Sequence, residues 1–113
     1  MLEPRLEQPP IDEIVRRIVA ALHPRRIILF GSRARGEARS YSDIDLFVEI
    51  DDDCGMSPLR RAQVVHGLFP RRLWSLDVVV YTSDEIEKFQ TWKGTILTVV
   101  QDEGRLLYER KAA

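Results

Sequence analysis

Cysteine, histidine and long apolar runs are scarce in this chain of 113 residues. Cys54 is the only cysteine, which excludes an internal disulfide and a thiolate zinc site and fits a reducing, cytoplasmic environment. Neither His23 nor His66 is paired with Cys54 by any recognised spacing, so we expect surface or capping roles for both. No apolar stretch is long enough to span a membrane, and the polar, proline-bearing N-terminus does not resemble a signal peptide.

Net charge is also small, −1, from 17 Lys and Arg against 18 Asp and Glu. No global field therefore draws the chain to a membrane or to DNA, and we expect no direct DNA binding. The length is that of one domain, so we predict a flexible segment at residues 1–10 and a single domain at residues 11–113. We interpret a second group of basic residues as a solvated face, with a partner surface as the alternative: Arg60, Arg61, Arg71 and Arg72.

The hydrophobic pattern predicts an α/β domain. Apolar residues recur at helical spacing from Ile11 to near Pro24, and further helices are expected to begin at Pro58 and after a capping box formed by Thr82 and Glu85. A last helix at residues 95–103 would end at Gly104. Strands are expected at residues 26–30, 43–50, 73–82 and 106–109, which gives a small mixed sheet of three to four strands with helices on one side.

Two carboxylates open the second strand. Side chains in a strand alternate faces, with a rise of ~3.3 Å per residue, so Asp43 and Asp45 point the same way ~6.6 Å apart along the backbone. Two carboxylates that close repel each other, and a divalent cation removes that penalty. Mg²⁺ favours such hard oxygen ligands together with substrate phosphates. The alternative is that Asp43 caps a neighbouring segment and Asp45 is solvated.

A glycine–serine turn follows the first strand. Gly31 permits a tight turn and a close approach to a ligand, and Ser32 is expected to begin a short helix whose N–H groups attract phosphate. Arg33 and Arg35 add cationic donors that suit phosphate oxygens, and Arg39 follows them. The spacing is neither that of a P-loop nor that of a Rossmann fingerprint. The alternative is an ordinary turn whose arginines face water.

A third carboxylate interrupts the strongest strand signal. Asp77 lies between Leu76 and Val78, where propensity disfavours aspartate and an unpaired buried carboxylate would be costly. If this strand lies beside the one that carries Asp43 and Asp45, all three carboxylates can meet at one metal cluster.

These residues resemble the DNA polymerase β-like nucleotidyltransferase superfamily, and within it the small minimal nucleotidyltransferase (MNT) proteins. The resemblance rests on Gly31-Ser32 with its Ala-Arg-Gly extension, on Ser42-Asp43-x-Asp45-Leu46, and on Asp77. It implies the polymerase β-like core fold. It also implies that Asp43, Asp45 and Asp77 hold two Mg²⁺ ions, that the glycine–serine turn binds a nucleoside triphosphate, and that Asp77 helps to activate the attacking hydroxyl.

The resemblance further implies a function. MNT proteins commonly pair with a helical HEPN-domain protein, often as antitoxin and ribonuclease toxin, and some transfer AMP to a tyrosine of the toxin. We therefore expect Mg²⁺-dependent transfer of AMP from ATP to a hydroxyl acceptor, with a HEPN-type partner or another subunit supplying the acceptor surface. Two alternatives stay open: an antitoxin that acts by occlusion alone, and the catalytic subunit of a small-molecule nucleotidyltransferase of the aminoglycoside-modifying type.

Overall fold

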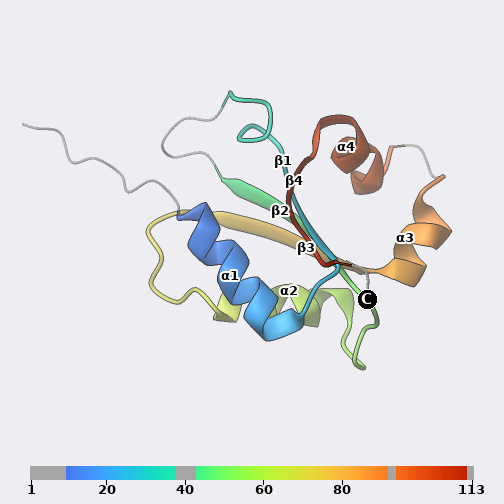
Figure 1. Ribbon diagram of the computed structural model, residues 1–113, viewed down its shortest axis with the longest axis horizontal. Coiled ribbons are helices and arrows are strands. Elements are labelled where there is room, and N and C mark those ends of the chain that lie inside the picture. The colour runs from blue at the N-terminus through green and yellow to red at the C-terminus, as the bar shows by residue number, and fades with distance from the viewer. Residues whose placement is uncertain (1–9, 38–42, 92–93, 112–113) are drawn as a thin grey trace, which may run out of the picture.

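The computed structural model describes residues 10–37, 43–91 and 94–111. The predicted flexible segment lies almost entirely outside this part of the chain. Four helices and four strands follow one another within it (Figure 1). They are listed here in chain order: α1 (Ile11–Leu22), β1 (Arg26–Phe30), β2 (Ile44–Ile50), α2 (Pro58–Gly67), β3 (Leu76–Thr82), α3 (Ser83–Phe89), α4 (Ile96–Glu103) and β4 (Arg105–Glu109).

The four strands form one mixed sheet in the order β3-β2-β1-β4. The β1 strand is antiparallel to both β2 and β4, whereas β2 and β3 are parallel. The parallel pair is connected through α2, which is the crossover that parallel neighbours require. The predicted fold class and the mixed sheet are thus confirmed.

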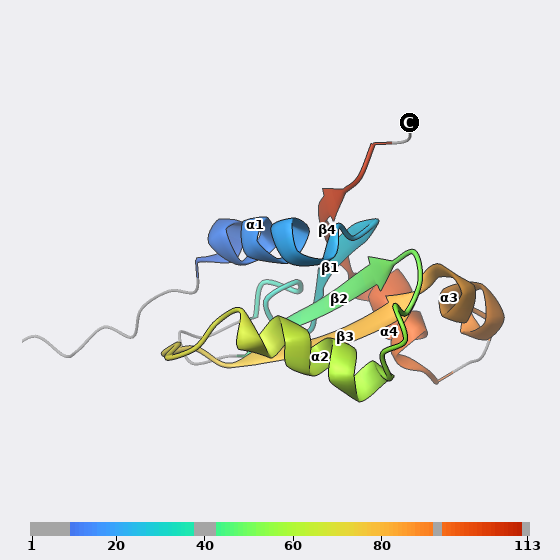
Figure 2. The same ribbon diagram turned by 90° about the horizontal axis from the view of Figure 1, so that it is seen from below.

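Helices α1 and α2 cover one face of this sheet (Figure 2). Alternate residues of β2 point to that face, and they are fully or almost fully buried: Ile44, Leu46, Val48 and Ile50. Ile14 and Ile18 of α1 and Val65 of α2 close the core from the helical side, each with at most 1% of its surface exposed. This core fixes which face of β2 is left for Asp45, because neighbouring residues of a strand point to opposite faces.

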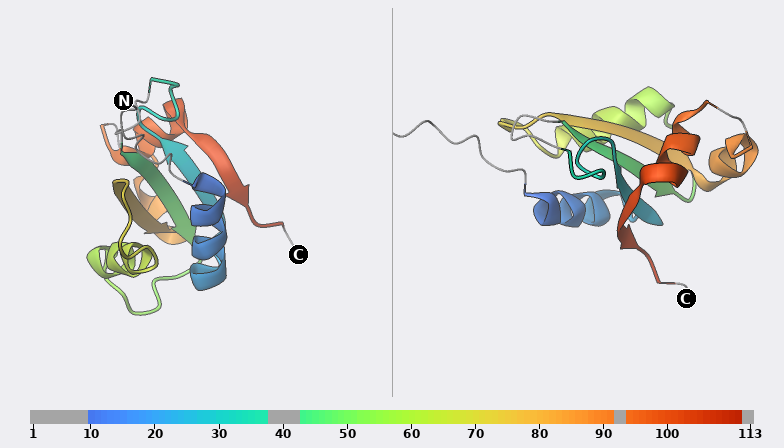
Figure 3. Two further views of the ribbon diagram at one scale, coloured as in Figure 1. Left: turned by 90° about the vertical axis from the view of Figure 1, so that its left-hand side faces the viewer. Right: turned by 90° about the horizontal axis from the view of Figure 1, so that it is seen from above.

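Helices α3 and α4 pack against part of the opposite face. Leu97 and Val100 of α4 join Phe30 of β1 and Phe47 of β2 in a second apolar cluster. Figure 3 shows α4 leading directly into β4 at the edge of the sheet. The predicted helical layer is therefore present as α1 and α2, and a second, smaller layer lies across the sheet from it.

Local signals place the helix ends as the sequence predicts. Pro58 begins α2 after Ser57, whose hydroxyl accepts a hydrogen bond from the Arg60 N–H. The capping box of Thr82 and Glu85 is formed in both directions at the start of α3. Gly104 ends α4 with an extended backbone, and a Cβ there would come within 2.6 Å of the Ile28 side chain. Gly104 is therefore required by the close approach of β4 to β1.

Two local predictions differ from the structure. Residues 31–36 form hydrogen-bonded turns rather than a short helix. Ala34 and Arg35 both donate to the Gly31 carbonyl, Gly36 donates to Arg33 and Glu37 to Ser32, so the bonds do not keep the regular four-residue spacing of an α-helix. The third strand begins at Leu76 instead of Leu73. Trp74 packs against Phe69 with ring centroids 5.6 Å apart and the rings tilted by 60°, so this apolar stretch packs on the segment that follows α2 and does not extend the strand.

The predicted solvated face of four arginines is wrong for two of them. Arg61 is 3% exposed and donates to Glu85 at 2.7 Å and to the Val80 carbonyl at 3.1 Å. Arg72 donates to the Phe69 carbonyl and contacts a ring nitrogen of His66. Arg60 and Arg71 are exposed. Sequence alone cannot separate Arg61 from them, because its partners Val80 and Glu85 are 19 and 24 positions away in the chain.

Candidate active site

Asp45 and Asp77 lie side by side on the sheet face opposite α1 and α2. They are register partners of the parallel strands β2 and β3, whose backbones lie about 4.8 Å apart. Register partners of parallel strands point to the same face, so the two carboxylates are neighbours although 31 other residues separate them in the sequence. Asp77 is exposed, and Asp45 is partly buried. The structure therefore provides the strand pairing on which the sequence prediction depended.

Asp43 is exposed and lies immediately before β2. The next N–H, of Ile44, donates to the Ser75 carbonyl at 2.9 Å, which attaches the start of β2 to the start of β3. Within the described ranges, no three Asp, Glu, His or Cys side chains are grouped closely enough to hold a metal ion together. The three-carboxylate metal centre stays a prediction. Mg²⁺ needs only one or two carboxylates when substrate phosphates supply further ligands.

The environment of Asp45 makes its negative charge costly. Burial raises the pKa of Asp45, and the carboxylates of Asp77 and Asp43 raise it further, in that order. The Arg35 guanidinium opposes this effect, and Glu103 adds to it. A cation bound between Asp45 and Asp77 would remove the repulsion, so the donor set fits a divalent metal ion.

Gly31 brings the backbone of the turn against the Asp45 carboxylate. Its φ of +76° lies in the left-handed region, and a Cβ at this position would be 2.1 Å from Oδ2 of Asp45. No other residue type fits without displacing that carboxylate. The sequence predicts a close approach to a ligand, and the structure adds a close approach to a candidate metal ligand.

The other predicted phosphate-binding residues belong to the same turn. Ser32 and Arg33 are partly buried directly after Gly31. The Arg35 guanidinium donates from Nε to Glu37 at 3.1 Å and from Nη1 to both carboxylate oxygens of Glu103, at 3.0 and 3.1 Å. Two acidic partners therefore hold Arg35 in this structure. Arg39 lies outside the described residues.

Glu103 is a site residue that the sequence analysis missed. It is the last residue of α4, and one of its oxygens accepts a hydrogen bond from the Gly31 N–H at 3.1 Å. An acidic residue at a helix C-terminus is unfavourable, because the last carbonyl groups carry partial negative charge. No basic residue in the last turn of α4 compensates the charge of Glu103. An acidic residue in this unfavourable place could have indicated that its cationic partner lies in another segment of the chain.

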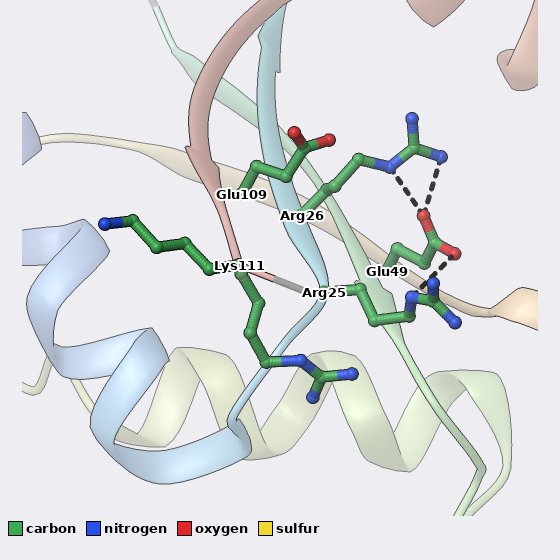
Figure 4. Close-up of a pocket in the computed structure, with 6 residues that line it drawn as sticks. Arg25, Arg26, Glu49, Glu109 and Lys111 are labelled. Carbon is green, nitrogen blue, oxygen red and sulfur yellow. Dashed lines mark hydrogen bonds and ion pairs between the residues drawn. The ribbon is translucent and has the colours of Figure 1, made fainter. Parts of the chain in front are cut away.

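A cavity of about 400 Å³ lies at the other end of the sheet, around the paired residues Arg26 and Glu49 (Figure 4). Four basic and two acidic residues line it, and some of these charges are already paired: Glu49 accepts from the Arg26 Nε at 2.7 Å and lies 4.0 Å from Arg25, while Arg110 contacts Asp51. The cavity is remote from Asp45 and Asp77, and none of its lining residues is an aspartate. We place the candidate active site at the Asp45–Asp77 end.

Comparison with protein families shows which family the chain resembles over most of its length. The model of the family described as nucleotidyltransferase domain matches residues 11–110, which include Gly31, Asp43, Asp45 and Asp77. The search of curated proteins returned no match.

Solved structures show the same fold at low sequence identity. A Sulfolobus solfataricus protein assigned as a nucleotidyltransferase aligns with a TM-score of 0.62 and 23% identity, covering 88% of this chain and 78% of its own. A mutant form of the toxin–antitoxin MntA–HpeT aligns with a TM-score of 0.60 and 20% identity, and the alignment covers 92% of this chain and 76% of that one. A toxin–antitoxin structure with AMP-PNP aligns with a TM-score of 0.56 and 19% identity, and the alignment covers 88% of this chain and 74% of that one.

Proposed function

The chain belongs to the nucleotidyltransferase domain family, and on that premise we propose that it transfers AMP from ATP to a hydroxyl group, specifically a tyrosine of a HEPN-type toxin partner. One observation carries the proposal above all: Asp45 and Asp77 are register partners on one face of the sheet, and the Gly31 turn lies against Asp45. The hydrogen-bond donors that we propose for the phosphates would then lie directly beside the metal ligands that we propose.

The proposed reaction assigns a separate task to each part of the site. The acceptor oxygen attacks the α-phosphorus of ATP, the bond between the α-phosphorus and the bridging oxygen breaks, and pyrophosphate leaves. Asp77, the exposed member of the pair, accepts the proton of the acceptor hydroxyl. The backbone around Ser32 and the guanidinium groups of Arg33 and Arg35 orient the phosphates, because phosphoryl-group chemistry depends on positioning and charge stabilisation.

A divalent cation fits the donor set of the site. Asp43, Asp45 and Asp77 would hold Mg²⁺, which, when bound, stabilises the negative charge on the phosphate oxygens. The raised pKa of Asp45 supports this assignment, since burial and the neighbouring carboxylates leave its charge poorly compensated by the protein itself.

The partner is proposed from the sequence resemblance and from the neighbouring folds. Two of the similar structures are toxin–antitoxin assemblies, and one of them carries AMP-PNP, an ATP analogue. We therefore propose that the helical partner presents its own tyrosine to Asp77.

The experiment that tests this function uses the genomic neighbour, which is the protein encoded next to this chain in the genome. It is incubated with the chain, ATP and Mg²⁺ and then analysed by intact mass spectrometry. We expect the mass of the neighbour to increase by one or more AMP groups on tyrosine. Asp77→Asn should bind the neighbour and leave its mass unchanged, whereas Asp84→Asn, an exposed aspartate of α3, should behave as the wild type.

Two other outcomes would contradict the proposal. Suppression of the neighbour's activity without any change in mass would favour an antitoxin that acts by occlusion. AMP transfer to a small hydroxyl compound, with no binding to the neighbour, would favour a small-molecule nucleotidyltransferase.

A further inference from the structure

Glu103 contacts both Gly31 and Arg35, and the helix that carries it is held rigidly in the fold. Leu97 and Val100 hold α4 against the sheet with 4% and 7% of their surface exposed, and Gly104 fixes the passage into β4. From there the Glu103 carboxylate contacts both the Gly31 N–H and the Arg35 guanidinium. Its side chain is 23% exposed, against 41% for Arg35, so Glu103 is the better anchored partner of this ion pair.

Arg35 carries a positive charge next to carboxylates that would hold a metal ion. Its guanidinium lies close enough to Asp45 to lower the pKa of that carboxyl. Two opposite charges that came within 4 Å of each other would attract by about 1 to 4 kcal/mol, depending on the local dielectric constant. A guanidinium without another partner would therefore pair with Asp45 or Asp77 and occupy the oxygens that a cation needs. Glu37, the second partner of Arg35, is 64% exposed and gives weaker anchorage.

We propose that Glu103 is a positioning residue that holds Arg35 and the Gly31 turn to the side of the aspartate pair, so that the carboxylates of Asp45 and Asp77 stay available to a divalent cation. The same contacts keep the arginine on the side from which it can reach a phosphate. Glu103 acts through Arg35 and Gly31 and is not itself a ligand of the substrate. This inference rests on the metal and phosphate roles of the proposed function.

The test is the affinity of the candidate site for Mn²⁺. It is measured by electron paramagnetic resonance on the full chain in the presence of a non-hydrolysable ATP analogue. Glu103→Asp keeps the charge but withdraws the carboxylate by one methylene. Glu103→Gln keeps an acceptor for the Gly31 N–H but loses the ion pair. We expect both variants to bind Mn²⁺ about two- to fivefold more weakly, which is the range for a competing, partly exposed ion pair.

Two further variants separate this role from general electrostatics. Asp102→Asn removes the same charge from the neighbouring, exposed position of α4 and should leave the affinity for Mn²⁺ unchanged. Measured with Mn²⁺ alone, without the ATP analogue, the double variant Glu103→Asp with Arg35→Gln should bind Mn²⁺ as tightly as the wild type, because the competing guanidinium is gone and no phosphate contact of Arg35 enters the measurement. Thermal unfolding of each variant checks that its fold is intact.

Several results would overturn the inference. Wild-type Mn²⁺ affinity in Glu103→Asp would mean that only the charge matters, and equal weakening in Asp102→Asn would mean the same. Weak binding that persists in the double variant would exclude the route through Arg35, and a wild type that binds no Mn²⁺ would remove the basis of the inference. Normal Mn²⁺ binding and the expected variant pattern without AMP transfer would refute the proposed function and leave this inference standing.

Discussion

Substitution of Gly31 by alanine separates the conformational role of this glycine from its contact with Asp45. A left-handed φ costs a residue with a Cβ roughly 1–2 kcal/mol. Gly31 has φ +76°, and its added Cβ would lie 2.1 Å from Oδ2 of Asp45. The Asp45 side chain must then leave its place, and an unfavourable rotamer costs about 0.5–1.5 kcal/mol more. The free energy of unfolding should thus fall by about 1.5–3.5 kcal/mol.

Gly55 provides the matched control. Its φ is +75°, and a Cβ there would meet nothing within 4 Å. Gly55→Ala should therefore lose only the conformational part, about 1–2 kcal/mol, which lowers the melting temperature by roughly 4–8 °C for each kcal/mol in a domain of about this size. Gly36→Ala, with φ +75° and equally open surroundings, repeats the control inside the turn itself.

The loss of activity should distinguish Gly31→Ala from Gly55→Ala more strongly than the loss of stability does. A displacement of about 1 Å in a positioned group can reduce the rate 100-fold, so Gly31→Ala should lose AMP transfer to at least that extent. Gly55→Ala should retain it at temperatures where the protein is folded. Urea unfolding followed by tryptophan fluorescence, together with a nucleotidyl-transfer assay, measures both quantities. Wild-type activity in Gly31→Ala, or an equal loss of activity in Gly31→Ala and Gly55→Ala, would refute the reasoning that a Cβ at position 31 acts by displacing the Asp45 carboxylate.

Further predictions concern charge. Because the pKa of Asp45 lies above its ordinary value of 3.8, this carboxyl destabilises the metal-free fold increasingly as pH rises from 3.8 through the raised pKa. Asp45→Asn should thus abolish transfer and yet raise the stability in EDTA, more at pH 7 than at pH 3; equal stabilisation at both pH values would contradict this. Arg61→Met leaves Glu85 and the Val80 carbonyl without a buried donor and should cost about 1–3 kcal/mol in urea unfolding. Burial raises the pKa of Glu85, but hydrogen bonds from Arg61 and the Thr82 N–H outweigh it and lower the pKa. The stabilisation by Glu85 is therefore complete above its ordinary value of 4.5 and is lost as pH falls through the lowered pKa, so the acid-induced loss should be smaller in Arg61→Met.

Local patterns in the sequence suffice for most of the elements. The spacing of Ile14 and Ile18 predicts α1, Pro58 marks the start of α2, and the capping box at Thr82 begins α3. These signals work because helix ends and apolar faces depend on residues within a few positions of one another. Alternation of side chains along β2 likewise places Asp45 on the face opposite the Ile44 core. None of the helices in the part of the chain described by the structure is long and apolar enough to cross a membrane, in line with the sequence.

Tertiary structure alone decides how distant residues combine. The parallel register of β2 and β3 makes Asp45 and Asp77 neighbours, although neither strand carries a local pattern that predicts this pairing. The contacts of Glu103 with Gly31 and Arg35 span 72 and 68 positions of the chain, and those of Arg61 with Glu85 span 24. Such contacts depend on how the helices pack on the sheet, and that packing is set by the shape and burial of the whole core rather than by any local pattern.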